Sequence, residues 1–445
     1  MSQRGKSEMK NKSEFLIVFL ILIFSFIYAS IAYADVLTLP DGLRLVTEEN
    51  RLVKITLREE AVSEADTLLA RSRMLPNINA SLTQTFLTYQ PEVIFGPQSV
   101  PMSEKNFLSY SLSIQQTLYD FKGDASRYES SKLILETKKI DTKRIRNLVS
   151  LDFTLIYFDI LESEKMVIVA EKEVQRLESH LRDAKNLYDE GVITKNDLFQ
   201  AEVRLSDVKQ RLMAVRNLRA INASRLNSVL ARPLKTDVQV MDVKETPSDG
   251  LNLDMEKAWE LAESQRPEIQ IVDTTLKSLD MEEAAKRSEY YPRFFLQGGY
   301  DFTENRYQVH EGNWLLTAGI NLNLFSGGST KAEVLKIKQQ SLKLFGQRDK
   351  LIDEVKLEVE KYILDLKTAR EKITVTKDAV GQAEENLRIN RVRYSEGVGT
   401  ATEVLDAVTL LTIAESNLYR SLYDFRRAEA GLVYSIGKDL SELYK

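Results

Sequence analysis

The sequence predicts a mainly helical protein with four short β-strands, built from two copies of one structural unit. Three observations carry this prediction: a repeated motif, long heptad patterns, and stretches in which apolar and polar residues alternate. The repeat is clearest where Tyr188-Asp-Glu-Gly-Val-Ile-Thr194 returns as Tyr394-Ser-Glu-Gly-Val-Gly-Thr400, a shift of 206 residues. A repeat of this length is too long for a solenoid, so one large structure is used twice.

The two copies differ in length at one place. Leu118 matches Leu324 at the shift of 206, whereas Pro76 matches Pro292 at a shift of 216. The first copy therefore contains ten additional residues between Pro76 and Leu118. We expect a longer loop there.

Composition excludes several classes of protein. The 445 residues include no Cys and only two His, so disulfides and thiolate metal sites are excluded. A charged fraction of 29% argues against a bundle of membrane-spanning helices. The net charge of −5 gives no attraction to nucleic acid. No Ser-His-Asp order, HExxH motif or recognisable carboxylate pair is present, so we expect no enzyme, no metal and no cofactor.

The N-terminus has the form of a secretory signal. An apolar run from Phe15 to Ile31 follows a basic start and precedes Ala32-Tyr33-Ala34. This order predicts a cleavable signal peptide over residues 1–34 and a mature chain that begins at Asp35. The alternative is an uncleaved anchor, because the apolar run nearly reaches spanning length.

Long helical hairpins are predicted in both copies. From Gly123 to Gly191 there is no other Gly and no Pro, which allows one helix on the order of 100 Å long. Apolar residues at spacings of three and four predict close packing of antiparallel helices, with tips near 191 and 397. The heptad positions are Ala170, Val174, Leu177, Leu181, Ala184 and Tyr188, then Leu198, Ala201, Leu205, Val208, Leu212 and Val215, and in the second copy Val404, Ala407, Leu411, Ala414 and Leu418.

Between the helices the period changes to two, which predicts β-hairpins over 76–120 and 292–326. Each predicted strand has about ten residues with one apolar and one small polar face, as in outer-membrane strands. The alternative is a soluble β-sandwich, which rarely consists of two hairpins separated by long helices. The apolar faces are Ile78, Ala80, Leu82 and Phe86; Leu108, Tyr110, Leu112 and Ile114; Phe294, Leu296, Gly298, Tyr300 and Phe302; and Trp314, Leu316, Ala318, Ile320, Leu322 and Leu324.

Four strands cannot close a barrel. An open sheet edge in lipid would leave backbone groups without hydrogen bonds, at several kcal/mol each. We therefore expect the chain to oligomerise, with a number of strands that is a multiple of four.

At this point the chain resembles the TolC-type outer-membrane efflux protein family, over essentially all of the predicted mature sequence. The resemblance rests on the duplicated layout, on the turn Leu324-Phe325-Ser-Gly-Gly328, and on the second tip from Tyr394 to Ala407. It implies a mainly α fold with β: four transmembrane β-strands per protomer complete a trimeric 12-stranded outer-membrane barrel. A long periplasmic α-helical barrel would continue the cylinder.

The expected domain order follows from the repeat and the resemblance. A signal peptide covers 1–34, the first repeat 35–231, an equatorial segment 232–255 and the second repeat 256–445. Each repeat would contain a helix, a β-hairpin and a long helical hairpin.

The resemblance also implies a function. The family supplies the exit duct of tripartite efflux pumps or type I secretion systems, and works with a periplasmic adaptor and an inner-membrane pump. The expected partners are two further copies in a homotrimer, these two proteins and outer-membrane lipid, with no nucleic acid. The alternative from another class is a periplasmic adaptor without its own pore; a passive porin would lack the helices. The cargo, whether drug, metal or polypeptide, stays open.

The same resemblance assigns roles at the tips. Tyr394 and Asp197 match a Tyr–Asp pair that holds the entrance shut, and Glu403 and Asp406 match acids that ring the lumen. The position of a second gate residue, an Arg, holds Gly399, for which Lys195 is a possible substitute. The alternative is that Tyr394 is a heptad residue and that the two acids lie on a solvated helix face. The expected adaptor-docking residues are Gly191, Val192, Thr194, Gly397, Val398 and Thr400.

Overall fold

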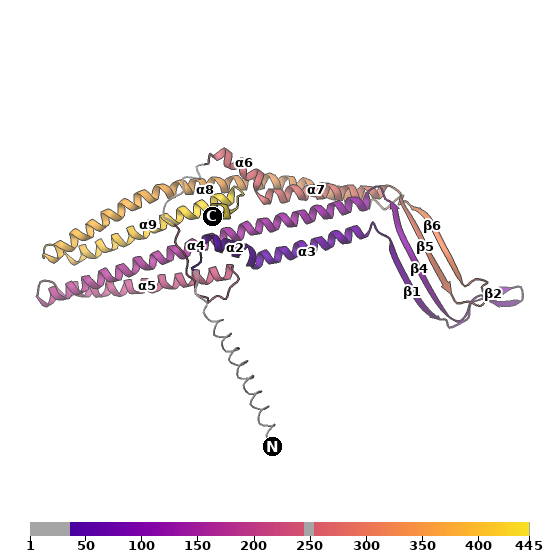
Figure 1. Ribbon diagram of the computed structural model, residues 1–445, viewed down its shortest axis with the longest axis horizontal. Helices are drawn as coiled ribbons and strands as arrows, with labels where there is room; N and C mark the ends of the chain where they lie inside the picture. Colours follow the sequence, from indigo (N-terminus) through magenta and orange to yellow (C-terminus); the bar gives the residue numbers. More distant parts are fainter. Residues whose placement is uncertain (1–35, 244–252, 445) are drawn as a thin grey trace, which may run out of the picture.

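A computed structural model describes residues 36–243 and 253–444. The predicted signal peptide, the expected first mature residue Asp35 and part of the equatorial segment lie outside the described residues. The molecule is elongated, with a curved sheet at one end and two helical tips at the other (Figure 1). No helix among the described residues is long and apolar enough to cross a membrane.

The duplication is visible in the lengths of the helices. The long helix of each copy has 67 residues and its antiparallel partner has 35. The first copy contains α2 (Leu39–Glu49), α3 (Arg51–Ser72), β1 (Asn77–Phe86), β2 (Glu92–Phe95), β3 (Gln98–Pro101), β4 (Asn106–Tyr119), α4 (Gly123–Asp189) and α5 (Lys195–Val229). The second contains α6 (Met255–Gln265), α7 (Pro267–Arg287), η2 (Ser288–Tyr290), β5 (Arg293–Thr303), β6 (Gly312–Asn321), α8 (Ser329–Ser395), α9 (Ala401–Ser435) and α10 (Leu440–Leu443).

The two strand pairs join into one four-stranded antiparallel sheet in the order β1-β4-β5-β6. The register places apolar residues on one face, in rows such as Ala80, Leu112, Tyr300 and Trp314. Ser81, Ser111, Asp301 and Asn313 form the neighbouring row on the opposite face. The predicted mainly α fold with β, and its two-faced sheet, are therefore confirmed.

Two details of the strands differ from the prediction. β6 ends at Asn321, so Leu322 and Leu324, expected in this strand, lie beyond it. The additional residues of the first copy contribute to a loop that carries a second small sheet, the β2–β3 hairpin. Alternation alone does not show where a ladder of hydrogen bonds stops, because apolar residues also occur beyond it.

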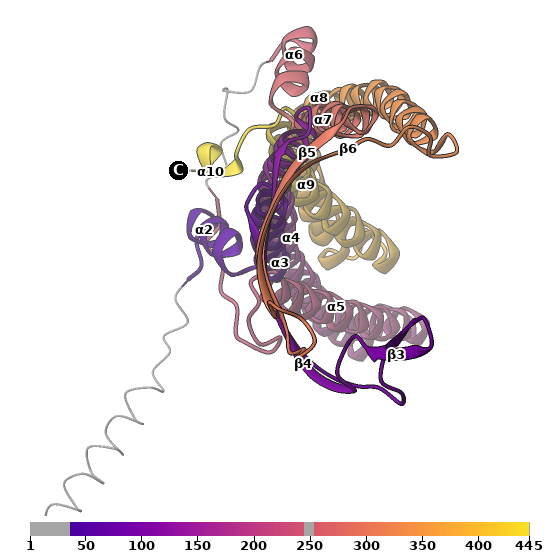
Figure 2. The same cartoon turned by 90° about the vertical axis from the view of Figure 1, so that its right-hand side faces the viewer.

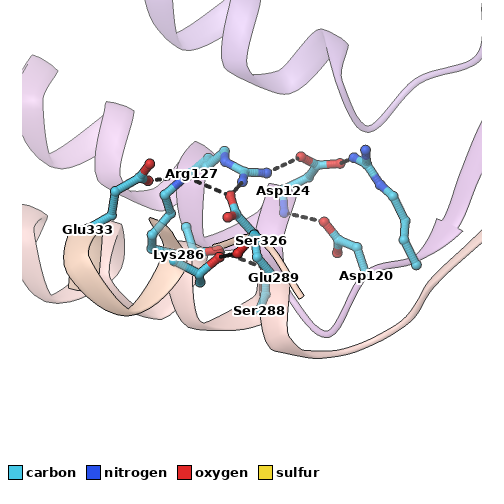
Figure 3. A network of polar contacts seen from close by, with 11 residues as sticks. Asp120, Asp124, Arg127, Lys286, Ser288, Glu289, Ser326 and Glu333 are labelled. Carbon is cyan, nitrogen blue, oxygen red and sulfur yellow. Dashed lines mark hydrogen bonds and ion pairs between the residues drawn. The ribbon is translucent and has the colours of Figure 1, made fainter. Parts of the chain in front are cut away.

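A polar network fixes the sheet to the helices (Figure 3). The carboxylate of Asp124, in the first turn of α4, accepts bonds from Arg127 at 2.9 Å and from Arg293 of β5 at 2.8 Å. Asp124 is 4% exposed, so its carboxylate is held in the packed junction by two charge-assisted hydrogen bonds. Gly123 is packed tightly here: a Cβ atom would lie 2.2 Å from the hydroxyl oxygen of Ser288, so that side chain would have to move. The start of α4 is therefore held directly against η2 and β5.

The largest apolar core lies midway along the molecule, around α4. There Phe153, Tyr157 and Phe158 are fully buried. The Tyr157 hydroxyl donates to the carbonyl oxygens of Leu37 at 2.9 Å and Met241 at 2.6 Å. The inter-copy segment is thereby tied to the N-terminal part of the described chain. A second cluster on α6, α8 and α9 and a third near the tips continue the packing.

Candidate functional site at the helical tips

The first tip is a tight turn between α4 and α5. Gly191 has a φ of +75°, a left-handed conformation that residues with a Cβ rarely adopt. The N–H of Val192 reaches back to the carbonyl of Leu187 at 2.8 Å, which ends α4 with paired backbone groups. Thr194 then caps α5 by accepting from the N–H of Asp197, while Asp197 accepts from the N–H of Thr194.

The second tip repeats this geometry between α8 and α9. Gly397 has a φ of +72°. The N–H of Val398 bonds the carbonyl of Arg393 at 2.9 Å. Thr400 and Glu403 form the second reciprocal cap, with the Thr400 N–H 2.9 Å from the Glu403 carboxylate. Two separate stretches of sequence thus produce the same structure.

Of the six expected docking residues, four have a role in the local structure of the turns and two do not. Gly191 and Gly397 supply left-handed backbone, and Thr194 and Thr400 supply helix caps. Val192 and Val398 do neither with their side chains, which are 56% and 68% exposed. The two valines are therefore exposed apolar groups at the two turns.

Asp197 and Glu403 have a structural role that was not predicted. Both occupy the third position of a capping box, and the Asp197 carboxylate also receives the Thr194 hydroxyl at 2.7 Å. The Thr400 N–H beside Glu403 lowers the pKa of that carboxyl, with a further contribution from Arg393 at 3.5 Å. The Thr-x-x-Asp and Thr-x-x-Glu spacings were a readable signal for this role.

Tyr394 does not bond Asp197 within the single chain. Its side chain is 4% exposed among the heptad residues of the tip cluster, and its hydroxyl has no hydrogen-bond partner in the described part of the chain. Burial raises the pKa of the Tyr394 phenol, and the nearby Asp197 and Asp183 carboxylates raise it further. The structure therefore places Tyr394 and Asp197 near each other but uses Tyr394 as a packing residue.

Neither the position of Gly399 nor Lys195, the possible substitute, supplies the interaction of the missing Arg among the described residues. A Cβ at Gly399 would lie 3.0 Å from the backbone nitrogen of Tyr394, which leaves little room for a side chain there. Lys195 lies over the ring of Phe199 at 5.3 Å, on its own helix. Arg393 is the basic group that approaches an acid of the second tip, at Glu403.

Asp406 differs from the other three proposed gate residues. It is exposed on α9, one turn after Glu403, and makes no hydrogen bond or ion pair with the described residues. Val404 and Ala407 beside it are buried in the seam. Asp406 is thus a free carboxylate near the tip. No group of three potential metal ligands occurs in the described ranges.

Contacts between the two helical hairpins were missed by the sequence analysis. Arg176 of α4 binds Glu415 of α9 through two bonds of 2.8 and 2.9 Å, and Glu415 is 6% exposed. Arg204 of α5 donates to the hydroxyl of Thr409 at 2.7 Å. Partners more than 200 residues apart leave no local pattern. The same region contains His180, which packs against the ring of Tyr394.

Comparison with known proteins agrees with this architecture. The family model described as outer membrane efflux protein matches residues 258–438. The chain is 24% identical over 293 residues to the probable efflux pump outer membrane protein TtgC of Pseudomonas putida, a match that covers 63% of this chain and 58% of that protein. It is 21% identical over 431 residues to the outer membrane protein TolC of Salmonella enteritidis, covering 92% of this chain and 84% of that protein.

Solved structures share the fold. The outer-membrane channel OprN superimposes with a TM-score of 0.79 at 17% identity, covering 91% of this chain and 90% of that one. The outer membrane protein VceC of Vibrio cholerae gives the same TM-score at 14% identity, with coverage of 90% and 96%. With its duplicated helical hairpins, four-stranded sheet and paired tips, the chain is similar to proteins of the outer membrane efflux family in sequence and shares the fold of the solved channels.

Proposed function

We propose that this protein is the outer-membrane exit duct of a tripartite efflux pump or a type I secretion system, extending into the periplasm and gated at its helical tips. The observation that carries the proposal is a two-faced sheet with two free edges, continued directly by long helices. The sheet of such a chain pairs all of its backbone groups only when further copies bind to both of its outer strands.

The uncovered sides of the chain continue from the two outer strands of the sheet onto the helices next to them. β1 and β6 form the outer strands of the sheet, and α3 and α8 adjoin them in sequence. Both helices carry exposed apolar side chains, which water would disfavour in a monomer. Those on α3 are Leu52, Ile55, Val62, Leu68 and Leu69, and those on α8 are Leu335, Leu342, Phe345, Leu357 and Leu364.

A closed barrel satisfies all backbone groups in lipid, which requires a number of strands that is a multiple of four. The family resemblance implies three chains and twelve strands. Native mass spectrometry of the detergent-extracted mature protein tests the assembly. We expect a homotrimer. A stable monomer or dimer would contradict the closed-barrel proposal.

The entrance would be lined by Asp197, Tyr394, Glu403 and Asp406. Two of these acids are held in helix caps, so Asp406 is the group best able to meet cations in a narrow pore. An acidic ring concentrates multivalent cations and lets them block conduction. In planar bilayers, Asp406→Asn should weaken block by multivalent cations more than Glu403→Gln does. Equal block in Asp406→Asn and wild type would place the ring elsewhere.

The tips would dock a periplasmic adaptor through Val192 and Val398. Both valines are exposed at turns whose other residues are used locally. Val192→Asp and Val398→Asp should abolish transport in cells without lowering the trimer level, while Val192→Thr and Val398→Thr, which keep the shape, should transport normally. Normal transport by both Asp variants would mean that the adaptor binds another surface.

The alternative, a periplasmic adaptor without a pore, is not favoured. This chain has two long helical hairpins and a continuous four-stranded sheet with one apolar face. Two similar proteins of Pseudomonas putida are named as outer membrane proteins of an antibiotic efflux pump and of a toluene efflux pump. Profiling a deletion strain for drug and solvent susceptibility, and for its secreted proteins, would identify the cargo.

A further inference from the structure

Near the proposed entrance, where the two helical hairpins join, two buried polar atoms have no hydrogen-bond partner among the described residues. His180 on α4 is 2% exposed and Tyr394 on α8 is 4% exposed. Their ring centroids are 5.1 Å apart, with the planes tilted by 50°. Neither Nε2 of His180 nor the hydroxyl of Tyr394 has a hydrogen-bond partner among the described residues. Native proteins rarely bury such atoms unpaired, so this contact requires an explanation.

The two rings belong to different hairpins. His180 lies on the hairpin of α4 and α5, and Tyr394 on the hairpin of α8 and α9. If the tips moved apart, both polar atoms would reach water and recover their hydrogen bonds. The packed state therefore carries a desolvation penalty that the separated state lacks. A charge on either group would make this penalty much larger, so the contact favours closure only while both groups are neutral.

The charges around the pair are few. Asp183 follows His180 by one turn on α4, Arg391 precedes Tyr394 by one turn on α8, and Asp197 of α5 lies near the phenol. Burial lowers the pKa of the His180 imidazole, Asp183 partly offsets this shift, and Arg391 adds to it. The packed seam thus accommodates the neutral ring and disfavours the imidazolium.

We propose that His180 is a positioning residue of the entrance: neutral, it holds Tyr394 and α8 against α4, and protonated, it releases them, so acidification widens the tips. The proposal rests on the proposed function as a gated duct. It assigns pH sensitivity to one of only two histidines in the chain.

The sign and size follow from proton linkage. A separated, hydrated imidazole titrates near its ordinary pKa of about 6.5, above that of the packed ring. Closure is therefore fully favoured above about pH 6.5 and weakens as the pH falls. Each unit below that value raises the ratio of open to closed by up to about tenfold per chain, until the packed ring also protonates. Three coupled chains would give up to about a thousandfold.

Because the chain contains no Cys, a single Cys can report the opening directly. Val398→Cys, labelled with a nitroxide in the full mature protein, gives tip-to-tip distances by electron spin resonance. Between pH 7.5 and 5.0 we expect the distances to lengthen. With His180→Asn, which carries the residue found at the matching position Asn386, they should stay constant. His310→Asn, in the exposed turn before β6, is the matched control and should respond like the parent.

His180→Phe keeps an aromatic ring that cannot protonate, and it should stay closed at every pH even if His180→Asn assembles poorly. Constant distances in the parent protein, or an undiminished acid response in His180→Phe, would overturn the proposal. Failure of the proposed duct is distinguishable, because native mass spectrometry would then show a monomer or a dimer at every pH.

Discussion

The two copies share their helix lengths but differ in what surrounds their long helices. α4 packs against α3, α5, α7 and α9, whereas one side of α8 stays uncovered at the edge of the arc (Figure 2). Phe158 is fully buried on α4, and Leu364, its match on α8, is 51% exposed. The duplication therefore determines the shape of each copy, but position in the assembly determines which residues are buried.

The largest expected difference between the copies lies at the contact between the two helical hairpins. Glu415 binds Arg176 in a nearly buried pair, while Lys209, at the matching position of the first copy, pairs with Glu178 at the surface. Glu415→Gln leaves the Arg176 charge without its partner and should cost about 3 kcal/mol. Lys209→Gln should cost less than about 1 kcal/mol. Hydrogen exchange along the first half of α9 and of α5 measures both.

A similar loss in the two variants would mean that the copies are energetically alike at the seam. A loss in Glu415→Gln alone would show that the inter-hairpin pair, rather than either hairpin by itself, stabilises the closed tips.

The strands are where the copies should behave alike. Leu112 on β4 and Leu316 on β6 lie on the apolar face of the sheet, in successive rows of that face. A lysine on the lipid face near the middle of the bilayer costs about 2–4 kcal/mol, so Leu112→Lys and Leu316→Lys should both reduce trimer assembly. Ser111→Lys and Thr317→Lys, on the opposite face, are the matched controls. Trimer yield on gels that preserve the assembly is the measurement, and equal yields in all four would contradict the assignment of faces.

The smallest effect concerns the turn from sheet to helix. Phe121 and Lys122 adopt left-handed backbone with φ of 54° and 68°, where the second copy has Gly327 and Gly328. Lys122→Gly removes this strain and should stabilise the protein by about 0.5–1 kcal/mol. Lys122→Ala retains the strain and should be neutral. Thermal unfolding of the trimer distinguishes them, and a destabilised Lys122→Gly would show that the lysine side chain contributes more than the strain costs.

Sequence reasoning succeeded where a pattern is local. Heptad spacing gave the helical hairpins, alternation gave the two faces of the sheet, and the repeat related the tips. The Thr194 and Thr400 caps were equally local and could have been predicted from their spacing. The Arg176–Glu415 pair and the burial of His180 depend on how one hairpin lies against the other. No periodicity within either hairpin encodes that arrangement.

The equal lengths of the paired helices have a geometric consequence. Because α4 and α8 have the same number of residues and both begin where a strand leaves the same end of the sheet, their tips end side by side (Figure 1). A trimer would present six almost identical ends in one plane, each with an exposed valine. A partner protein would then meet a sixfold surface although the channel itself would have threefold symmetry, so one kind of binding site repeated six times would suffice to seal the junction.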